Sequence, residues 1–245
     1  MSDFKVETKC LHSGYTPSKG EPCALPIYQS TTYKYDTTDE MGQLFDLKAE
    51  GYFYTRLQNP TNDAVAAKIA DLEGGVAAIL TSSGQAANFY AVFNICEAGD
   101  HVVAASTIYG GTFNLLLHTL PQYGITTTFV DIFNDGELEA AIQDNTKAVF
   151  IETLGNPNSD VVDIEAVAEI AHKHKIPLIV DNTFATPYLV RPIEYGADIV
   201  VHSATKFIGG HGTAVGGVIV DGGKFDWEAS GKFPVLTEPD PSYHG

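Results

Sequence analysis

Short apolar runs rich in β-branched residues alternate with segments of helical spacing along most of the 245-residue chain, and this alternation limits the possible folds. We expect strands over residues 76–81, 101–105, 125–131, 148–152, 178–181 and 199–202, and helices over residues 85–96, 112–120, 136–143 and 164–174. Strands joined through helices normally lie parallel in one sheet that is covered on both faces. The sequence therefore predicts an α/β fold with a largely parallel, doubly wound sheet flanked by helices.

The first 61 residues lack this alternation. They are rich in Thr, Tyr, Pro and Gly and show little periodicity, which is typical of an extended arm with short structured pieces. Helical spacing begins near residue 62 and ends at Gly74-Gly75. We therefore expect an arm over residues 1–61, packed on another surface, and a folded domain over residues 62–245.

Charge and cysteine usage exclude several classes of protein. Fourteen basic and 31 acidic residues give a net charge of −17, which repels nucleic acids and anionic membrane surfaces. The first ten residues are too charged for a signal peptide, and no apolar stretch is long enough to span a bilayer. Cys10, Cys23 and Cys96 suit neither a disulfide framework nor a zinc site. These features predict a cytoplasmic protein.

Polar residues follow several of the apolar runs, at the strand ends where doubly wound sheets bind ligands. They are Ser82-Ser83-Gly84-Gln85, Glu152 to Asn156, Asp181-Asn182-Thr183 and Ser203-Ala204-Thr205-Lys206. Backbone N–H groups at Ser83-Gly84 would suit a phosphate at the start of the next helix. Alternatively, Ser82 or Ser83 only caps that helix.

A carboxylate and an amine in this set suggest pyridoxal phosphate. Asp181 ends a buried run and needs a cationic or hydrogen-bonding partner, which a protonated pyridine nitrogen would supply; alternatively, it caps the next turn. Lys206 is either solvated or an amine that enters a pocket, and Ser203 and Thr205 beside it offer hydroxyls to a phosphate. His202 and His211 have no carboxylate or thiol at a recognised ligand spacing, so we expect no metal site.

Motifs along the whole chain resemble the Cys/Met-metabolism family of fold-type I pyridoxal-phosphate enzymes, and within it the O-acetylhomoserine sulfhydrylases. They are Tyr54-Thr55-Arg56, Asn59-Pro60-Thr61, Ser83-Gly84-Gln85-Ala86, Tyr109-Gly110-Gly111-Thr112, Asp181-Asn182-Thr183 and Ser203-Ala204-Thr205-Lys206. The resemblance implies the large domain of a fold-type I transferase, with a mostly parallel seven-stranded sheet. Family members continue past residues 242–245 into a smaller C-terminal domain that binds the substrate carboxylate, so we expect this chain to lack that domain.

The resemblance also implies roles for individual residues. Lys206 would carry pyridoxal 5′-phosphate as a Schiff base, Asp181 would pair with the ring nitrogen, and Tyr109 would stack on the ring. The phosphate would be held by Ser83, Gly84, Gln85, Ser203 and Thr205, and Asn156 would lie near the ring hydroxyl. Tyr54 and Arg56 would reach the phosphate of a neighbouring subunit, which implies a homo-oligomer, a dimer of dimers. The alternatives are a turn before Pro157 for Asn156 and a surface salt bridge for Arg56.

The implied activity is a γ-replacement in methionine biosynthesis: O-acetyl-L-homoserine reacts with sulfide or a small thiol to give homocysteine or methionine and acetate. Gly111 stands where methionine γ-lyases typically carry Cys, which counts against that activity. A cystathionine γ-synthase or γ-lyase would share the same cofactor residues. A non-catalytic nucleotide-binding α/β domain is a third possibility, although the sequence has no G-x-G-x-x-G or P-loop motif.

Overall fold

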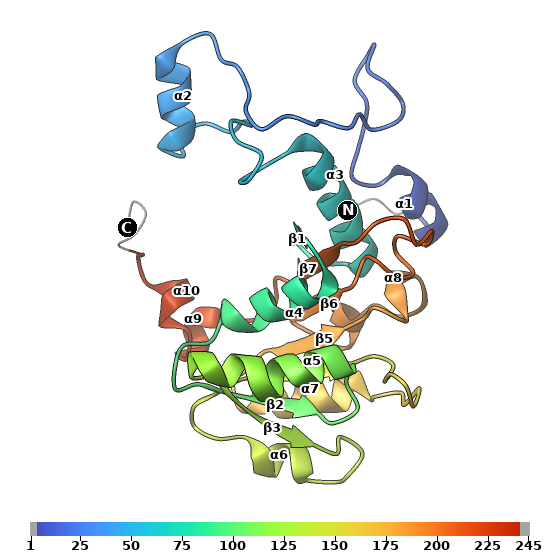
Figure 1. Cartoon of the computed structure of the whole chain (residues 1–245), viewed down its shortest axis with the longest axis vertical. Coiled ribbons are helices and arrows are strands. Elements are labelled where there is room, and N and C mark those ends of the chain that lie inside the picture. The colour runs from blue at the N-terminus through green and yellow to red at the C-terminus, as the bar shows by residue number, and fades with distance from the viewer. Residues whose placement is uncertain (1–3, 241–245) are drawn as a thin grey trace.

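The computed structural model describes residues 4–240, which form a seven-stranded sheet with helices on both faces and an extended N-terminal segment (Figure 1). The strands are β1 (Ala77–Thr81), β2 (His101–Ala105), β3 (Thr126–Val130), β4 (Thr146–Glu152), β5 (Leu178–Asp181), β6 (Ile199–His202) and β7 (Gly217–Asp221). They lie in the order β1-β7-β6-β5-β4-β2-β3. The pairs β2–β3, β2–β4, β4–β5 and β5–β6 are parallel, whereas β7 is antiparallel to both β1 and β6. The predicted α/β fold and largely parallel sheet are confirmed.

The central strands are buried on both faces. Val149, Phe150 and Ile151 in β4 have no exposed surface, and every residue from Leu178 to Val180 in β5 is equally buried. Such continuous apolar runs are typical of parallel strands covered by helices on both sides. In the parallel register of these two strands, Glu152 lies opposite Asp181. Two carboxylates therefore reach the same edge of the sheet.

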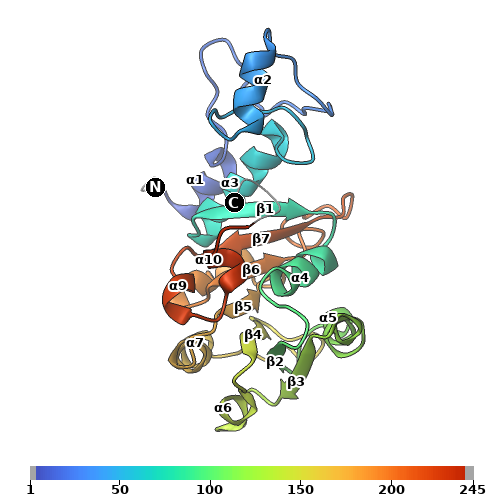
Figure 2. The same ribbon diagram turned by 90° about the vertical axis from the view of Figure 1, so that its left-hand side faces the viewer.

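Helices α3 to α7 agree with the predicted alternation, whereas the short helices α1, α2 and α8 to α10 were not predicted. The helices are α1 (Val6–His12), α2 (Thr38–Phe45), α3 (Pro60–Glu73), α4 (Gly84–Phe93), α5 (Gly110–Asn114), α6 (Glu137–Ala141), α7 (Ile164–Lys173), α8 (Thr186–Leu189), α9 (Trp227–Ser230) and α10 (Pro234–Thr237). A π-helical turn, η1 (Leu115–Thr119), and a 3₁₀ turn, η2 (Leu120–Tyr123), extend α5, and a further 3₁₀ turn is η3 (Pro192–Tyr195). Figure 2 shows α4 and α5 on one face of the sheet and α7 on the other. No helix within residues 4–240 combines the length and apolarity needed to cross a bilayer.

Helix α3 connects the arm to the sheet. It begins after Asn59, whose side chain accepts a hydrogen bond from Thr61 N–H, and it has Pro60 in its first turn. It ends, as predicted, at Gly74, which has a left-handed φ of 78°. Its last residue, Glu73, is fully buried, so the end of α3 reaches into the core beside the sheet.

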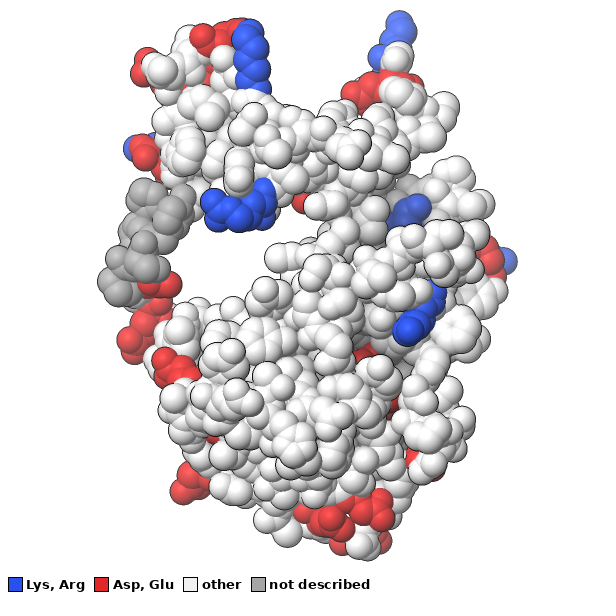
Figure 3. Space-filling view, in the orientation of Figure 1, with Lys and Arg blue, Asp and Glu red and all other residues white. Residues whose placement is uncertain are grey.

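The N-terminal segment extends away from the sheet. Helix α1 packs on α3, whereas α2 lies at the outer end of the segment (Figure 1). Figure 3 shows a hollow between this segment and the body of the molecule. Several large apolar side chains of the segment are exposed, among them Ile27 at 83% and Leu57 at 56%. The short helices agree with an arm of short structured pieces, and its boundary at residue 61 stays a prediction.

Candidate active site

A cavity of about 410 Å³ lies at the carboxyl ends of β4, β5 and β6, beside the first turn of α4. Nine of the predicted site residues line it: Ser83, Gly84, Gln85, Tyr109, Asn156, Asp181, Ser203, Thr205 and Lys206. The remaining lining residues are Asn88, Glu152, Leu154, Thr183, Phe184 and Val215. Segments that are far apart in the chain therefore meet at one edge of the sheet, where ligands of doubly wound folds bind.

The first turn of α4 forms one wall of the cavity. The Ser83 hydroxyl accepts a hydrogen bond from Ala86 N–H at 3.1 Å, so Ser83 caps the helix. Gly84 packs tightly against Ser203, since a Cβ on Gly84 would lie 2.5 Å from Ser203 Cβ. This contact brings the N–H groups of the helix next to the Ser203 hydroxyl. A helix N-terminus beside a hydroxyl is suited to a phosphate.

The neighbouring carboxylates of Glu152 and Asp181 also line the cavity. Burial raises the pKa of Asp181 above its usual value. Burial raises the pKa of Glu152 to about 8; the nearby Asp181 adds to this rise, whereas a hydrogen bond from Tyr109 N–H opposes it. Two neighbouring buried carboxylates with raised pKa values favour a shared proton or a bound cation. This part of the cavity is therefore suited to a cationic group.

The two oxygens of Asp181 have different surroundings. Oδ1 accepts hydrogen bonds from both the N–H and the hydroxyl of Thr183, as in a turn cap. Oδ2 receives only a long bond of 3.4 Å from Asn88 Nδ2, which bonds more closely to Thr112 Oγ1 at 2.8 Å. Asp181 thus stabilises the following turn through one oxygen and leaves the other available to a ligand.

Lys206 lines the cavity, and its side-chain amine is free to bind a ligand. Within residues 4–240 no hydrogen bond or ion pair involves its Nζ atom, and its backbone N–H donates to Ser203 O at 3.1 Å. Thr205 next to it is less free, because its hydroxyl accepts a bond from Gly216 N–H at 3.1 Å. A primary amine without a counter-ion at the edge of a polar cavity can react with an aldehyde.

The ring of Tyr109 and the side chain of Asn156 complete the lining. Gly111 leaves room for this ring, since a Cβ there would lie 2.5 Å from Tyr109 Cε1. The backbone N–H of Tyr109 donates to Glu152 Oε1 at 2.8 Å, so Glu152 anchors the segment that carries the ring. Asn156 precedes a cis peptide bond to Pro157.

Two predicted residues lie outside the cavity. Tyr54 and Arg56 belong to the N-terminal segment, and the Arg56 guanidinium carbon lies 5.2 Å from the centre of the Tyr54 ring. Within residues 4–240 Arg56 forms no ion pair, so the surface salt bridge considered for it is not found. Among the same residues no three His, Cys, Asp or Glu side chains are grouped to hold a metal ion.

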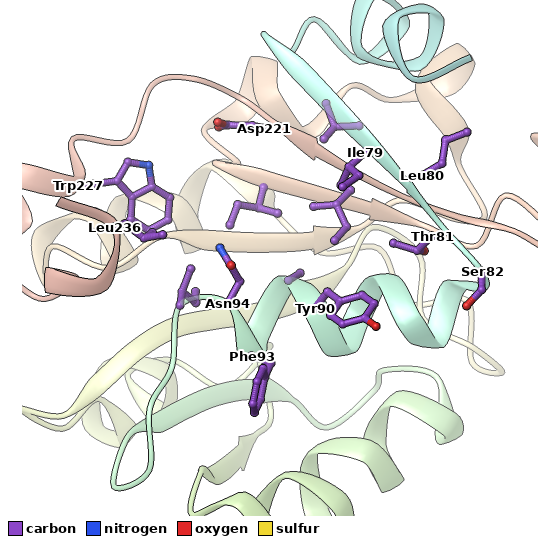
Figure 4. A pocket seen from close by; sticks show the side chains of 15 residues that line it. Ile79, Leu80, Thr81, Ser82, Tyr90, Phe93, Asn94, Asp221, Trp227 and Leu236 are labelled. Carbon is purple, nitrogen blue, oxygen red and sulfur yellow. The ribbon is translucent and has the colours of Figure 1, made fainter. Parts of the chain in front are cut away.

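A second cavity, of about 910 Å³, lies between α4, the strands β1 and β7, and the helices α9 and α10 (Figure 4). Its lining is mostly apolar and includes Ile79, Tyr90 and Trp227. Asp221 is the one charged residue among the described side chains that line it. Although this cavity is larger, its described lining lacks the amine, the paired carboxylates and the helix N-terminus, so the first cavity is the candidate active site.

Sequence comparisons agree with this site. Residues 7–237 match the family model described as Cys/Met metabolism PLP-dependent enzyme. The chain is 52% identical to an O-acetyl-L-homoserine sulfhydrylase of Leptospira meyeri over 244 residues, which are 99% of this chain and 55% of that protein. It is 53% identical to a homocysteine synthase of Schizosaccharomyces pombe over 242 residues, which are 98% of this chain and 56% of that protein. The chain thus spans about half the length of the curated relatives it matches.

Solved structures of related enzymes are also similar to this chain. A proposed O-acetylhomoserine (thiol)-lyase of Campylobacter jejuni superposes with a TM-score of 0.94 and 41% identity, covering 99% of this chain and 61% of that one. That protein carries N′-pyridoxyl-lysine-5′-monophosphate at its position 205. A cystathionine γ-lyase of Lactobacillus plantarum superposes with a TM-score of 0.81 and 37% identity, covering 96% of this chain and 57% of that one.

Proposed function

Because the chain belongs to the Cys/Met-metabolism family of PLP-dependent enzymes, we propose that it binds pyridoxal 5′-phosphate through Lys206. We further propose that the whole protein catalyses γ-replacement on O-acetyl-L-homoserine with sulfide or a small thiol. The observation that carries the first proposal is the meeting of an unpaired lysine amine, a buried carboxylate and a helix N-terminus in one cavity of about 410 Å³. These three groups complement the aldehyde, the ring nitrogen and the phosphate of the cofactor.

The cavity contains residues suited to the ring nitrogen, the phosphate, the ring and the ring hydroxyl of this cofactor. Asp181 Oδ2, with only a 3.4 Å bond from Asn88, is suited to the protonated ring nitrogen. The first turn of α4, with Ser83, Gly84 and Gln85, and the Ser203 and Thr205 hydroxyls would hold the phosphate. The Tyr109 ring would stack on the cofactor ring, and Asn156 would contact the ring hydroxyl. A buried carboxylate beside a cation avoids the cost of an unpaired charge.

When bound, the cofactor stabilises negative charge at the α-carbon of an amino-acid substrate. Asp181 would hold the proton on the ring nitrogen and so keep the ring electron-poor. The Lys206 amine would take the proton from the α-carbon and move protons at the β-carbon. Loss of acetate from the γ-carbon and addition of sulfide there would give homocysteine and acetate.

Two relatives support the choice of reaction. The O-acetylhomoserine sulfhydrylase and the homocysteine synthase are 52% and 53% identical to this chain, compared with 37% for the cystathionine γ-lyase. A cystathionine γ-lyase or γ-synthase activity remains a second candidate, because a solved γ-lyase has the same fold with a TM-score of 0.81. Cofactor attachment depends on residues of this chain, whereas turnover is proposed for the whole protein.

We also propose that residues 1–61 act as an arm between subunits of a homo-oligomer, a dimer of dimers. The exposed apolar side chains of this arm support the proposal, as does the position of Tyr54 and Arg56 outside the cavity of their own chain. In this arrangement both residues would reach the cofactor phosphate of a neighbouring subunit. The three free cysteines favour a reducing, cytoplasmic location.

Cofactor attachment is tested by incubating the chain with pyridoxal phosphate, reducing it with borohydride and mapping the peptides by mass. We expect the pyridoxyl mass on the peptide that contains Lys206. It should disappear in Lys206→Ala and persist in Lys19→Ala, a matched change at an exposed lysine. An adduct that survives Lys206→Ala would refute the assignment. Assays of the whole protein with O-acetylhomoserine and either sulfide, cysteine or cystathionine separate the two candidate reactions.

A further inference from the structure

A polar cluster lies buried behind the candidate active site. Glu73, Asn182 and His202 each have no exposed surface. His202 Nε2 lies 2.6 Å from Glu73 Oε1, and Asn182 Nδ2 donates to the same oxygen at 2.9 Å. One carboxylate oxygen of α3 thus accepts two hydrogen bonds, one from the residue after β5 and one from the last residue of β6.

The two donors lie close in sequence to Asp181 and Lys206. Asn182 directly follows Asp181 at the end of β5, and His202 ends β6, four residues before Lys206. Asn182 Nδ2 also donates to Val190 O at 2.9 Å, which holds its side chain from a second direction. Glu73 therefore connects α3 to the segment of the proposed ring-nitrogen partner and to that of the proposed cofactor lysine.

A further bond links the two segments on the side of the cavity. Ser203 N–H donates to Thr183 Oγ1 at 2.8 Å, and the Thr183 hydroxyl in turn donates to Asp181 Oδ1. The two segments are thus bonded to each other through Thr183 and Ser203 on the cavity side, and both are bonded to Glu73 on the other side. Because Glu73 contacts both segments, we expect a substitution of Glu73 to change the positions of Asp181 and Lys206 together.

The cluster is costly for the fold. A buried carboxylate needs compensating partners, and apolar residues of similar volume often serve stability equally well. Within residues 4–240 the buried side-chain atoms without a hydrogen-bond partner are Glu73 Oε2, Asn182 Oδ1, His202 Nδ1 and Thr127 Oγ1. Three of these four atoms belong to the cluster. Unsatisfied buried polar groups concentrated beside a site indicate a role in that site.

His202 also acts electrostatically on Asp181. Burial raises the pKa of Asp181, and His202 opposes this rise together with the bonds from Thr183 and Asn88. Two titratable side chains act on or respond to Asp181: Glu152 lies opposite it on β4 and has its own pKa raised by Asp181, and His202 on β6 lowers the pKa of Asp181. Glu73 in turn contacts His202, since its Oε1 atom lies 2.6 Å from His202 Nε2.

We propose that Glu73 is a positioning residue that acts through His202 and Asn182 to fix the segments of Asp181 and Lys206 and to favour the ionised form of Asp181. The functional part rests on the proposed cofactor binding, whereas the fixing of the two segments does not. Two variants separate the effects. Glu73→Gln removes the charge that both donors share. His202→Gln keeps a donor toward Glu73 and removes the imidazole ring.

A matched control lies at the opposite end of the same two strands. His172 Nε2 lies 2.8 Å from Oδ2 of the buried Asp198, which also accepts a bond from Leu178 N–H at the start of β5. His172→Gln therefore disturbs a similar His–carboxylate pair that is far from the cavity. It should lower the melting temperature and leave both readouts below unchanged.

The first readout is amide hydrogen exchange of residues 182–184 and 203–206 in the cofactor-free chain. We expect Glu73→Gln to accelerate exchange in both segments together by about tenfold, as for the loss of one charge-assisted hydrogen bond. His202→Gln should leave exchange close to that of the parent. If Glu73→Gln lowers the melting temperature without changing either segment, the proposed fixing is wrong.

The second readout is the affinity for pyridoxal phosphate and the pH midpoint of its visible absorbance band. We expect both variants to weaken affinity by about tenfold and to shift the midpoint, since the ring nitrogen would face a less ionised Asp181. An unchanged midpoint in both variants would overturn the electrostatic part of the proposal. A parent chain with no adduct on Lys206 would instead refute the proposed cofactor binding, and the exchange data would still decide the role of Glu73.

Discussion

Replacing Glu152 by Gln should make the stability of the cofactor-free chain less dependent on pH. Burial and the neighbouring Asp181 raise the Glu152 pKa from 4.5 to about 8 in the folded chain. A raised carboxyl pKa favours folding fully below the unfolded value, and this contribution is lost as pH rises through the folded value. The parent should therefore lose stability between about pH 4.5 and pH 8. The amide introduced by Glu152→Gln does not ionise, and its oxygen would still accept the bond from Tyr109 N–H.

The size of the effect follows from the same pKa values. A change from 4.5 to about 8 corresponds to at most about 5 kcal/mol at 1.4 kcal/mol per pH unit, and proton sharing with Asp181 reduces it. Urea denaturation at pH 5, 7 and 8.5 measures the free energy of unfolding of both proteins. We expect nearly equal values at pH 5 and an advantage of roughly 2 to 5 kcal/mol for Glu152→Gln at pH 8.5.

Glu165→Gln, at an exposed position of α7, provides the control and should follow the parent at every pH. A constant difference between Glu152→Gln and the parent across the three pH values would refute the reasoning, because it would mean that Glu152 keeps its charge in the folded chain.

Three further predictions concern the walls of the cavity and the core. Gly84→Ala should weaken the affinity for pyridoxal phosphate at least about tenfold in equilibrium dialysis, because its Cβ would lie 2.5 Å from Ser203 Cβ; unchanged affinity would argue against a phosphate site there. Asp181→Asn should shift the pH midpoint of the visible band, since the ring nitrogen loses its anionic partner, and an unmoved midpoint would contradict that pairing. Phe233→Ala should cost about 3 to 5 kcal/mol in urea denaturation without changing affinity, because Phe233 is 1% exposed and packs edge-on against Trp227; a cost below about 1 kcal/mol would contradict its place in the core.

The sequence predicted the central strands well, because buried β-branched runs differ sharply from the polar turns that bound them. The bounds predicted for β2, β5 and β6 are the observed ones. Strand β7 was missed. It follows β6 without an intervening helix and lies antiparallel to it, so the alternation that identifies parallel strands gives no signal for it. The helices α1 and α2 were also missed as individual elements, since the Thr- and Pro-rich arm shows little periodicity.

For the site, as for the fold, the sequence predicted features with a local pattern and missed those that depend on contacts between distant segments. Motifs at strand ends identified eight of the nine predicted residues that line the cavity, and the family resemblance added Tyr109. The role of Glu152 depends on its position opposite Asp181 in the sheet, and the local sequence does not predict this strand register. The local signal is a charged residue at the end of an apolar run. The contact between Glu73 and His202 joins residues 129 positions apart, and only the folded sheet brings them together.

The position of β1 in the sheet also has a consequence for the time at which the molecule can form. Within residues 4–240, β1 is hydrogen-bonded in the sheet to β7 alone, and Ala77 pairs with Asp221, which lies 144 residues later (221 − 77). At about 5 to 20 residues per second, a ribosome needs about 7 to 29 seconds to synthesise that interval. During this time β1 has no partner strand, and Glu73, which precedes β1, lacks its contact with His202 until residue 202 is synthesised. The growing chain therefore completes the support behind its site only after the lysine segment has emerged, so pyridoxal phosphate is expected to bind after synthesis has passed β7.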